Sequence, residues 1–508
     1  AGGSISLAAG NELRMRAGSL VSESGDVTLH GKDIQLAAGH EKKHDAYGLQ
    51  YKAQGLFSST KTTLAYDSQK DTVLAPILIG RNITLNAENS IKAAAPRLAA
   101  EQDITLKAAD ISLAAEATHE KEETRREVKK SGLMGAGLGI FLGTRKEKDS
   151  FQGDYTTQVG AELTAGGNVN IEAQNQADLQ AADIAAGGNI GIRAADVQIR
   201  GAENIYLEKE THERSRTGLT LSLGGNSVRA AESVWQPLKR AGEVEDPRLK
   251  ALYEIRAGRA LYENRRELKN IAKGNLSLNL HIGLGTSKSI ETQETRSTDT
   301  ARSILRSGQD LQLQAEKKDI RIQGSEVSGR NVRLEAKGNI RLEAAEEQTT
   351  ATTKSRQTSV EIGATYGASG LSGLNLNASR MQSESRETKT SYTPTLVQEQ
   401  ETVEAHAGKD IALLGSQVQG EKVGMNVGGS LTIETLQEKE TYEEKTKSAG
   451  IGLSLDIHKG LLGNGKKGTL FGKPDISLSG SKGNIHSDYE SAREQAGVFA
   501  GKEGFDIE

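Results

Sequence analysis

Residues 40–44 read HEKKH, which matches the H-E-x-x-H pattern of zinc peptidases. In that pattern two histidines one helical turn apart bind zinc, and the glutamate acts on the metal-bound water. The same place in the repeat recurs at residues 119–123 and 212–216, where HEKEE and HERSR lack the second histidine. Glycines on either side leave a stretch too short for the long ligand helix, and no third ligand can be assigned. We therefore interpret HEKKH as a polar repeat segment, and we expect no metal site and no cofactor.

Other catalytic groups are scarce in the sequence. The chain has no cysteine, and its remaining histidines are scattered singly, so no pair of nucleophile and base can be assigned. The acidic residues are spread along the chain, and a single tryptophan is poor material for stacking sugar rings. We expect no catalytic residues, no small-molecule substrate and no enzyme. A polysaccharide-active β-helix enzyme is the competing interpretation, which three or more carboxylates in one outer groove would favour.

Composition narrows the class of protein. The 508 residues carry 64 Lys and Arg against 68 Asp and Glu, so no global basic charge points to nucleic acid. Gly is abundant at 57 and aromatic residues make up only 4%, so a core must be built from small and β-branched side chains. No apolar run is long enough for a membrane helix. The sequence opens with AGGSISL and closes with GFDIE, and we expect it to be a piece of a longer protein.

Short segments of alternating apolar residues recur every 20 to 22 positions. Alternation with period 2 places one set of side chains on a single face of a strand. A repeat of this length, with two or three short strands in each period, is typical of one coil of a parallel β-helix, in which stacked coils bury ladders of apolar side chains. We predict an all-β fold, a right-handed parallel β-helix with Asn and Asp at the corners, where they tolerate left-handed backbone and hydrogen-bond their own turn. The pairs that set the spacing are Ile5 and Val27, Leu13 and Ile34, Ile83 and Ile104, Ile91 and Ile111, Val169 and Ile190, Leu311 and Val332, Ile320 and Ile340, and Ile411 and Leu431.

A longer period lies over the coils. Each group of coils is followed by a charged, Glu-rich run and then by an apolar stretch spaced by glycine, for example THEKEETRREVKK followed by SGLMGAGLGIFLGT. We therefore divide one continuous solenoid into five repeat blocks, at residues 1–79, 80–165, 166–307, 308–407 and 408–508.

The apolar stretches of the third block alternate most regularly. TGLTLSLGG and NLSLNLHIGLG are expected to pair as antiparallel strands outside the β-helix coils, as extra-helical β-hairpins. We favour hairpins that lie against one face of the solenoid as a second sheet and cover its edge. The functional alternative is that their apolar faces contact a membrane or a partner, because strands of this length span outer membranes. The residues that would make this contact are Leu219, Leu221, Leu223, Leu276, Leu278, Leu280, Ile282 and Leu284.

A helical insertion is predicted over residues 227–273, between those two stretches. Asp246 and Pro247 are typical of a helix N-cap and first helical position. Apolar residues then follow at helical spacing, at Leu249, Leu252, Tyr253, Ala257, Ala260 and Leu261. Its basic residues, Arg256, Arg259, Arg265, Arg266 and Lys269, favour a solvated helix face, and contact with phosphate or lipid headgroups is the alternative.

Taken together, the repeats resemble those of filamentous haemagglutinin-type exoproteins. The closest likeness is to the second haemagglutinin repeat region of contact-dependent growth inhibition exoproteins from two-partner secretion systems. The blocks of coils, the stretch KKSGLMGAGLGIFLGTRKEKDSFQGDYTTQVGAELTAGGNVNIEA and the tail SDYESAREQAGVFAGKEGFDIE carry this resemblance.

The resemblance implies a secreted protein on the surface of a Gram-negative bacterium. Its implied partners are a dedicated outer-membrane two-partner secretion transporter, and the outer membrane or a surface receptor of a target cell. We expect a non-enzymatic β-helical stalk that mediates contact between cells and delivery of a C-terminal toxin across a target outer membrane. An adhesin segment that binds surface glycans or receptors is the first alternative, and the polysaccharide-active enzyme is the second.

Overall fold

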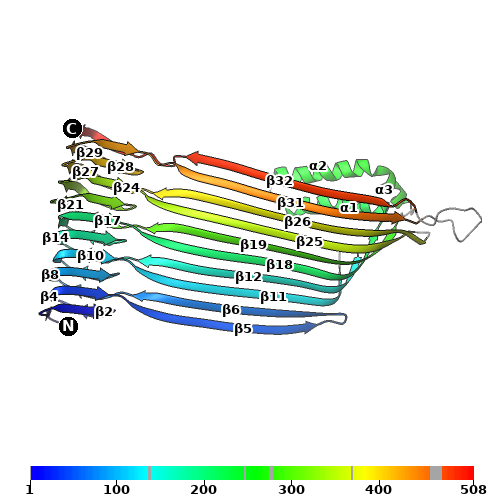
Figure 1. The fold of residues 1–508 in the computed structure, drawn as a ribbon, viewed down its shortest axis with the longest axis horizontal. Helices are drawn as coiled ribbons and strands as arrows, with labels where there is room; N and C mark the ends of the chain where they lie inside the picture. The colour runs from blue at the N-terminus through cyan, green and yellow to red at the C-terminus, as the bar shows by residue number, and fades with distance from the viewer. Residues whose placement is uncertain (1, 136–138, 245–246, 274–277, 368–369, 458–471) are drawn as a thin grey trace, which may run out of the picture.

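A computed structural model describes residues 2–135, 139–244, 247–273, 278–367, 370–457 and 472–508. Figure 1 shows three parts: a stack of short strands that includes both termini, a broad sheet of long strands that extends away from the stack, and helices beside the far end of that sheet. The chain passes back and forth between the first two parts, so that every long hairpin leaves and rejoins the stack.

The stack is a parallel β-helix, which confirms the predicted solenoid. Its strands pair in parallel with the equivalent strand of the next coil, and apolar side chains point inward to form one continuous core. The described strands of this solenoid are β1 (Ile5–Ala8), β2 (Glu12–Arg16), β3 (Ser19–Val21), β4 (Val27–Ala37), β7 (Ile77–Gly80), β8 (Ile83–Ala94), β9 (Arg97–Ala100), β10 (Ile104–Ala114), β13 (Glu162–Ala165), β14 (Val169–Gln180), β15 (Asp183–Ala186), β16 (Ile190–Ala194), β17 (Asp196–Arg200), β20 (Ile304–Ser307), β21 (Asp310–Ala315), β22 (Ile320–Gln323), β23 (Glu326–Ala336), β24 (Ile340–Glu343), β27 (Thr395–Ala407), β28 (Ile411–Leu414), β29 (Ser416–Val427), β30 (Leu431–Glu434) and β33 (Gly497–Ile507).

The register of the coils follows the spacing of the sequence. All eight apolar pairs that define the 20–22-residue period lie directly opposite one another on neighbouring strands. Ile171, Ile192 and Leu313, for example, stack in successive coils and are almost completely buried. Because each coil covers the apolar face of the next, the core depends on stacking and not on large side chains.

The corners use Asn and Asp in a different way from the prediction. The side chain of Asp103 accepts a hydrogen bond from the backbone N–H of Asn168 at 2.6 Å, and Asn168 accepts one from the N–H of Asn189 at 2.9 Å. These side chains therefore join successive coils and do not close their own turn. Among the described residues, the non-glycine positions with positive φ are Ala17, Ala95 and Ala181, so Asn and Asp do not use the left-handed backbone that they tolerate.

The hairpin strands form one antiparallel sheet, in the order β32-β31-β26-β25-β19-β18-β12-β11-β6-β5. The predicted pairing of the two third-block stretches is confirmed, with Leu219 opposite Leu284. The described strands are β5 (Gly39–Gln54), β6 (Ser58–Leu74), β11 (Glu116–Gly135), β12 (Gly139–Val159), β18 (Ala202–Gly224), β19 (Asn279–Ala301), β25 (Ala345–Gly367), β26 (Gly370–Thr393), β31 (Glu438–Asp456) and β32 (Asp475–Ser491).

The expectation that these hairpins lie against the solenoid is wrong. The sheet projects away from the solenoid (Figure 1), and its strands pair with one another. Successive hairpins leave the solenoid side by side, so each hairpin covers the polar backbone edge of the next. Covering the solenoid is not needed to satisfy their hydrogen bonds, and both faces of the sheet are left free of the coils.

The predicted helical insertion is confirmed as α1 (Asn226–Glu243), α2 (Pro247–Glu263) and α3 (Arg265–Ala272). Pro247 is the first residue of α2, whereas the N-cap assigned to Asp246 lies outside the described residues. Ala257 and Ala260 are buried, but the larger Leu252 is 62% exposed. Small residues therefore hold the helices together. Within the part of the chain that is described, no helix is both long enough and apolar enough to cross a membrane.

One half-buried acid, Glu399, is expected to make the solenoid sensitive to pH. Glu399 lies where the pairing of β27 with β29 shifts register, and its Oε1 accepts the backbone N–H of Glu421 at 3.0 Å. Its Oε2 is buried and has no hydrogen-bond partner among the described residues. Burial, with a smaller effect of the neighbouring Glu401 and Glu421 carboxylates, raises the pKa of Glu399 to about 7.

Replacing Glu399 by Gln is therefore expected to remove a pH dependence of the stability of β27 and β29. Since its pKa is higher in the folded chain, the native protein gains stability from the protonated acid below about pH 4.5 and loses it as the pH rises through about 7. The loss is on the order of 1–2 kcal/mol after allowing for partial solvent screening. Hydrogen exchange of β27 and β29 in acidic and in alkaline buffer measures it. If the stability of the native protein depends on pH in the same way as that of Glu399→Gln, Glu399 is not the source of the pH dependence. Glu335→Gln on β23 is the control.

Candidate contact surface on the antiparallel sheet

Apolar side chains of eight neighbouring strands lie in rows across one face of the antiparallel sheet. On β12 the side chains of Ile140 and Leu142 point to this face, because residues two apart share a face. The register continues each row from strand to strand, so that Leu142, Leu219 and Leu284 stand side by side. We call these rows the apolar band; it comprises Leu133, Ile140, Leu142, Leu219, Leu221, Leu223, Leu280, Ile282, Leu284, Val360, Ile362, Leu374, Leu376, Ile451, Leu453, Leu455, Ile476 and Leu478.

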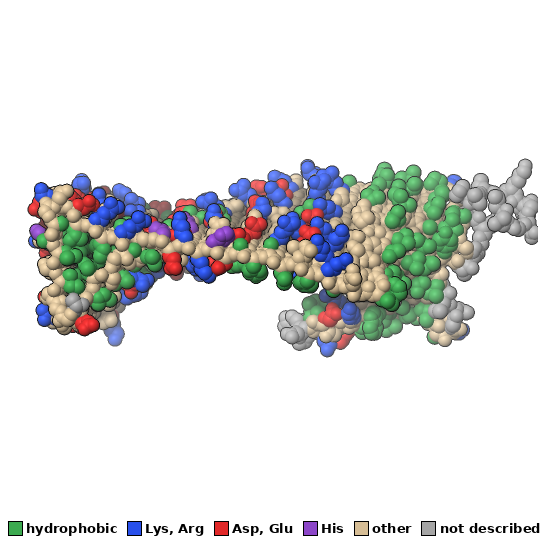
Figure 2. Space-filling view, turned by 90° about the horizontal axis from the view of Figure 1, so that it is seen from below, with side chains coloured by type: hydrophobic (Ala, Val, Ile, Leu, Met, Phe, Trp, Pro, Cys, Tyr) green, Lys and Arg blue, Asp and Glu red, His purple; other side chains and the backbone are tan. Residues whose placement is uncertain are grey.

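The apolar band is open to solvent. Leu284 is 60% exposed, Ile362 61% and Leu478 77%. Figure 2 shows these apolar side chains gathered at the far end of the sheet, with Lys and Arg gathered on the side toward the solenoid. Eight strands spaced about 4.8 Å apart make the band roughly 34 Å wide. Contiguous apolar patches of this extent mark contact sites for proteins, membranes or ligands.

The opposite face of the same strands is small and polar. Gly143, Gly218 and Gly285 lie side by side there, and the row continues on later strands through Glu361, Asn377, Gly452 and Ser477. The one large apolar side chain on this face near the glycines is Phe141, which is 3% exposed and lies beneath the guanidinium of Arg216 at 4.0 Å. The far end of the sheet is therefore amphipathic, with its apolar side chains on one face and glycine or polar side chains around Phe141 on the other.

Six of the eight predicted contact residues fall on this surface. Leu219 lies opposite Leu284, Leu221 opposite Ile282, and Leu223 opposite Leu280, all within the apolar band. Leu278 is 40% exposed and lies just before β19, whereas Leu276 lies outside the described residues.

The sequence interpretation missed that other blocks extend the same rows. Leu142 of the second block and Ile362 of the fourth stand in one row with Leu219 and Leu284. The signal was present, because every block has a glycine-spaced apolar stretch after its charged run. The pairing between hairpins could not be predicted from the sequence, and this pairing joins the separate stretches into one surface.

HEKKH lies on β5, an extended strand and not a helix. The Nδ1 of His40 lies 2.8 Å from Asp71, its Nε2 lies 3.2 Å from Glu116, and His44 lies 3.0 Å from Asp67. Each ring thus pairs with carboxylates of neighbouring strands. Within the described ranges, no three His, Cys, Asp or Glu side chains are grouped so that they could hold a metal ion.

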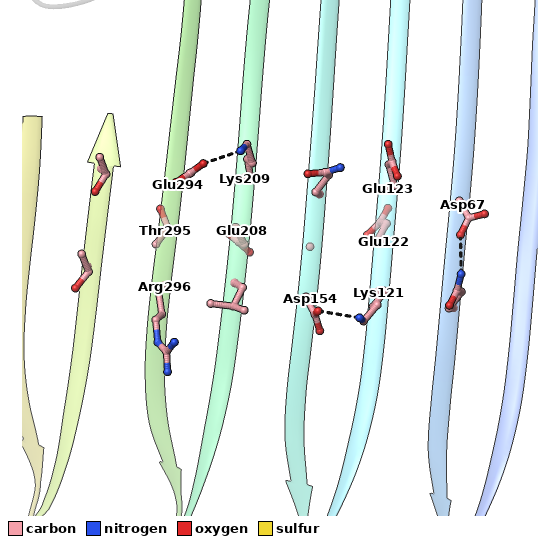
Figure 3. Close-up of a pocket in the computed structure, with 16 residues that line it drawn as sticks. Asp67, Lys121, Glu122, Glu123, Asp154, Glu208, Lys209, Glu294, Thr295 and Arg296 are labelled. Carbon is pink, nitrogen blue, oxygen red and sulfur yellow. Dashed lines mark hydrogen bonds and ion pairs between the residues drawn. The ribbon is translucent and has the colours of Figure 1, made fainter. Parts of the chain in front are cut away.

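A groove of about 600 Å³ crosses the middle of the sheet, nearer the solenoid (Figure 3). Six acids are among its lining residues, which is the arrangement that would favour the enzyme interpretation. Three of these acids are in ion pairs, however, including Asp67 with His44 at 3.0 Å. Lys209 reaches Glu294 at 2.7 Å and Lys121 reaches Asp154 at 3.2 Å, as the dashed lines in Figure 3 show. The acids are Asp67, Glu122, Glu123, Asp154, Glu208 and Glu294.

Two of the acids in the groove are held in their charged form. The hydrogen bond from His44 lowers the pKa of Asp67, and the one from Lys209 lowers the pKa of Glu294. Hydrolysis of a glycosidic bond by paired carboxylates needs one with a raised pKa to protonate the leaving group. No aromatic side chain is among the residues that line the groove, so a stacking platform for sugar is also missing there.

Most of the chain matches known protein families. A family described as "Hemagglutinin repeat" matches residues 53–148, 142–234 and 284–449, and a second, described as "Haemagglutinin repeat", matches residues 1–60. No solved structure matches the chain.

Curated relatives agree with these matches. The chain is 30% identical to the "Toxin CdiA" of Yersinia pestis over 85% of its length and 31% identical to the "Deoxyribonuclease CdiA" of Yersinia pseudotuberculosis over 85%. It is 26% identical to the "tRNA nuclease CdiA" of Yersinia mollaretii over 96%. The matched parts make up 13%, 40% and 17% of those relatives, so the chain spans less than half of each.

Proposed function

This chain belongs to the haemagglutinin repeat family of filamentous haemagglutinin-type, contact-dependent growth inhibition exoproteins, and on that premise we propose that it is a non-enzymatic stalk segment that delivers a toxin. The parent would be exported by an outer-membrane two-partner secretion transporter and displayed on the cell surface. The segment would then make contact with a target cell and help a C-terminal toxin to cross the target outer membrane. The nuclease and toxin names of the relatives would refer to that other part of the protein.

The apolar band is the observation that carries this proposal. A stalk that served only as a spacer would have no need for eight strands to present Leu and Ile to water. Exposing these side chains is unfavourable by about 25 cal/mol for each Å² that could be buried, so the band is expected to be covered during function. A bilayer fits the surface because one face of the strands is apolar, while the other carries glycine, Ser and Asn that suit water.

Flotation with outer-membrane lipid vesicles tests this proposal. The full chain is expected to float with the vesicles, and a variant with Leu278→Ser, Leu280→Ser and Ile282→Ser is expected to remain at the bottom of the gradient. A matched control removes three exposed apolar side chains outside the band, through Leu7→Ser, Ile79→Ser and Leu207→Ser. This control should float like the native chain, because its band is intact.

Two outcomes would count against membrane contact. If the native chain stays folded and does not float, the band is covered by something other than a bilayer, and the adhesin interpretation gains. If the control loses flotation together with the band variant, general hydrophobicity explains the binding and the band has no special part in it.

A further inference from the structure

A row of lysines lies on the same face of the sheet as the apolar band; it adjoins the band on β11 and β12 and continues onto β6 and β5 at the edge of the sheet. Lys52, Lys61, Lys129 and Lys146 stand directly opposite one another on β5, β6, β11 and β12. We call these four residues the lysine row. The same register passes through a serine on β18 to Lys288 on β19, and no acidic side chain stands in the row on these six strands.

This arrangement is unfavourable for the sheet alone. Like charges directly opposite each other on neighbouring strands destabilise a sheet. Lys52, Lys61 and Lys129 have no acidic partner among the described residues. The ammonium of Lys146 forms an ion pair at 3.2 Å with the carboxylate of Glu127, which stands one row closer to the solenoid. Four aligned cations, three of them unpaired, indicate that an anionic partner covers them during function.

The position of the row identifies the partner. On β12 the residues that share the face run Leu142, Thr144, Lys146 from the far end inward, so one row of hydroxyls separates the apolar band from the lysines. Figure 2 shows the same order, with apolar side chains, then a strip without charge, then Lys and Arg. Four residues of strand place the lysines about 13 Å from the adjoining apolar row. This is the order of layers from hydrocarbon to headgroup in a bilayer.

We infer that the lysine row binds the phosphates of anionic lipid headgroups at the surface of the membrane that the apolar band enters. The inference rests on the proposed function and adds to it the chemistry of the lipid. Lysine ammonium groups bind phosphates as point charges and reach them on flexible stems. The overall charge of −4 shows that this is a local feature and not a general affinity for polyanions.

The test compares Lys61→Gln, Lys129→Gln and Lys146→Gln in one full-length chain with the native protein. The probes are phosphatidylcholine vesicles with and without phosphatidylglycerol. Each lysine near an anionic surface contributes about 1 kcal/mol, so the triple variant is expected to bind the anionic vesicles roughly a hundredfold more weakly. Its binding to pure phosphatidylcholine should be unchanged. The control Lys32→Gln, Lys317→Gln and Lys318→Gln removes the same charge from the solenoid and should bind like the native chain.

Two further measurements distinguish lipid binding from a loss of folding and from binding of free phosphate. The row variant should be about as resistant to unfolding as the native chain, because the like-charge repulsion that it loses offsets the loss of the Lys146–Glu127 ion pair. Lost binding with a loosened fold would overturn the inference. Soluble inorganic phosphate at the same phosphate concentration should not displace the vesicles, since a row of sites needs an array of headgroups. Displacement would assign the row to free phosphate and overturn lipid recognition.

The vesicle-binding results distinguish failure of the lysine inference from failure of the proposed function. Equal binding of native chain and row variant to anionic vesicles, with loss in the band variant, would overturn the role of the lysines and leave membrane contact standing. No binding of the native chain to either kind of vesicle would overturn both.

Discussion

Ile192→Ala is expected to destabilise its region of the solenoid by about 2–5 kcal/mol, the usual cost of removing a large aliphatic side chain from a packed core. Ile192 on β16 is 1% exposed and stands between Ile171 and Leu313 of the adjoining coils. Backbone hydrogen bonds fix the separation of the coils, so the cavity left by the substitution cannot collapse. The same substitution at Leu284 on β19, which is 60% exposed, should change stability by no more than about 0.5 kcal/mol.

Hydrogen exchange measured by peptide is the appropriate method for this comparison, because repeat arrays do not unfold as a single unit. Ile192→Ala should raise exchange in β14, β16 and β21 by a factor of roughly thirty or more, and Leu284→Ala should leave exchange in the sheet near the native level. If Leu284→Ala proves as destabilising as Ile192→Ala, the band belongs to a packed core and is not a contact surface. The core variant is therefore expected to lose stability and the band variant to keep it.

The sequence was sufficient to predict the solenoid because each coil repeats the same local rule. A pair such as Val169 and Ile190 fixes register, inward direction and period together. The corners were less predictable, since an Asn such as Asn168 can bond either its own turn or the next coil. The choice depends on the stacking of coils, which a single segment does not encode.

The contact surface was predictable only in part. Alternation in the third block placed Leu219 and Leu284 on one face of a hairpin, and the structure agrees. The direction of the sheet and its continuation to Leu142 and Ile362 depend on how hairpins from separate blocks pair. The lysine row shows this most clearly, because Lys61 and Lys129 are far apart in the chain and become neighbours only through that pairing.

One face of the far end of the sheet is expected to enter a bilayer, and a fluorescent probe on each face distinguishes the two faces. The chain has no cysteine, so a single introduced cysteine can carry an environment-sensitive fluorophore at a unique place. Leu374 and Asn377 lie three residues apart on β26, are both exposed and point to opposite faces. On addition of outer-membrane lipid vesicles, a fluorophore at Leu374→Cys is expected to shift to the blue and gain intensity, while one at Asn377→Cys keeps the spectrum it has in water. A spectrum unchanged at both positions, or the same shift at both, would contradict the account.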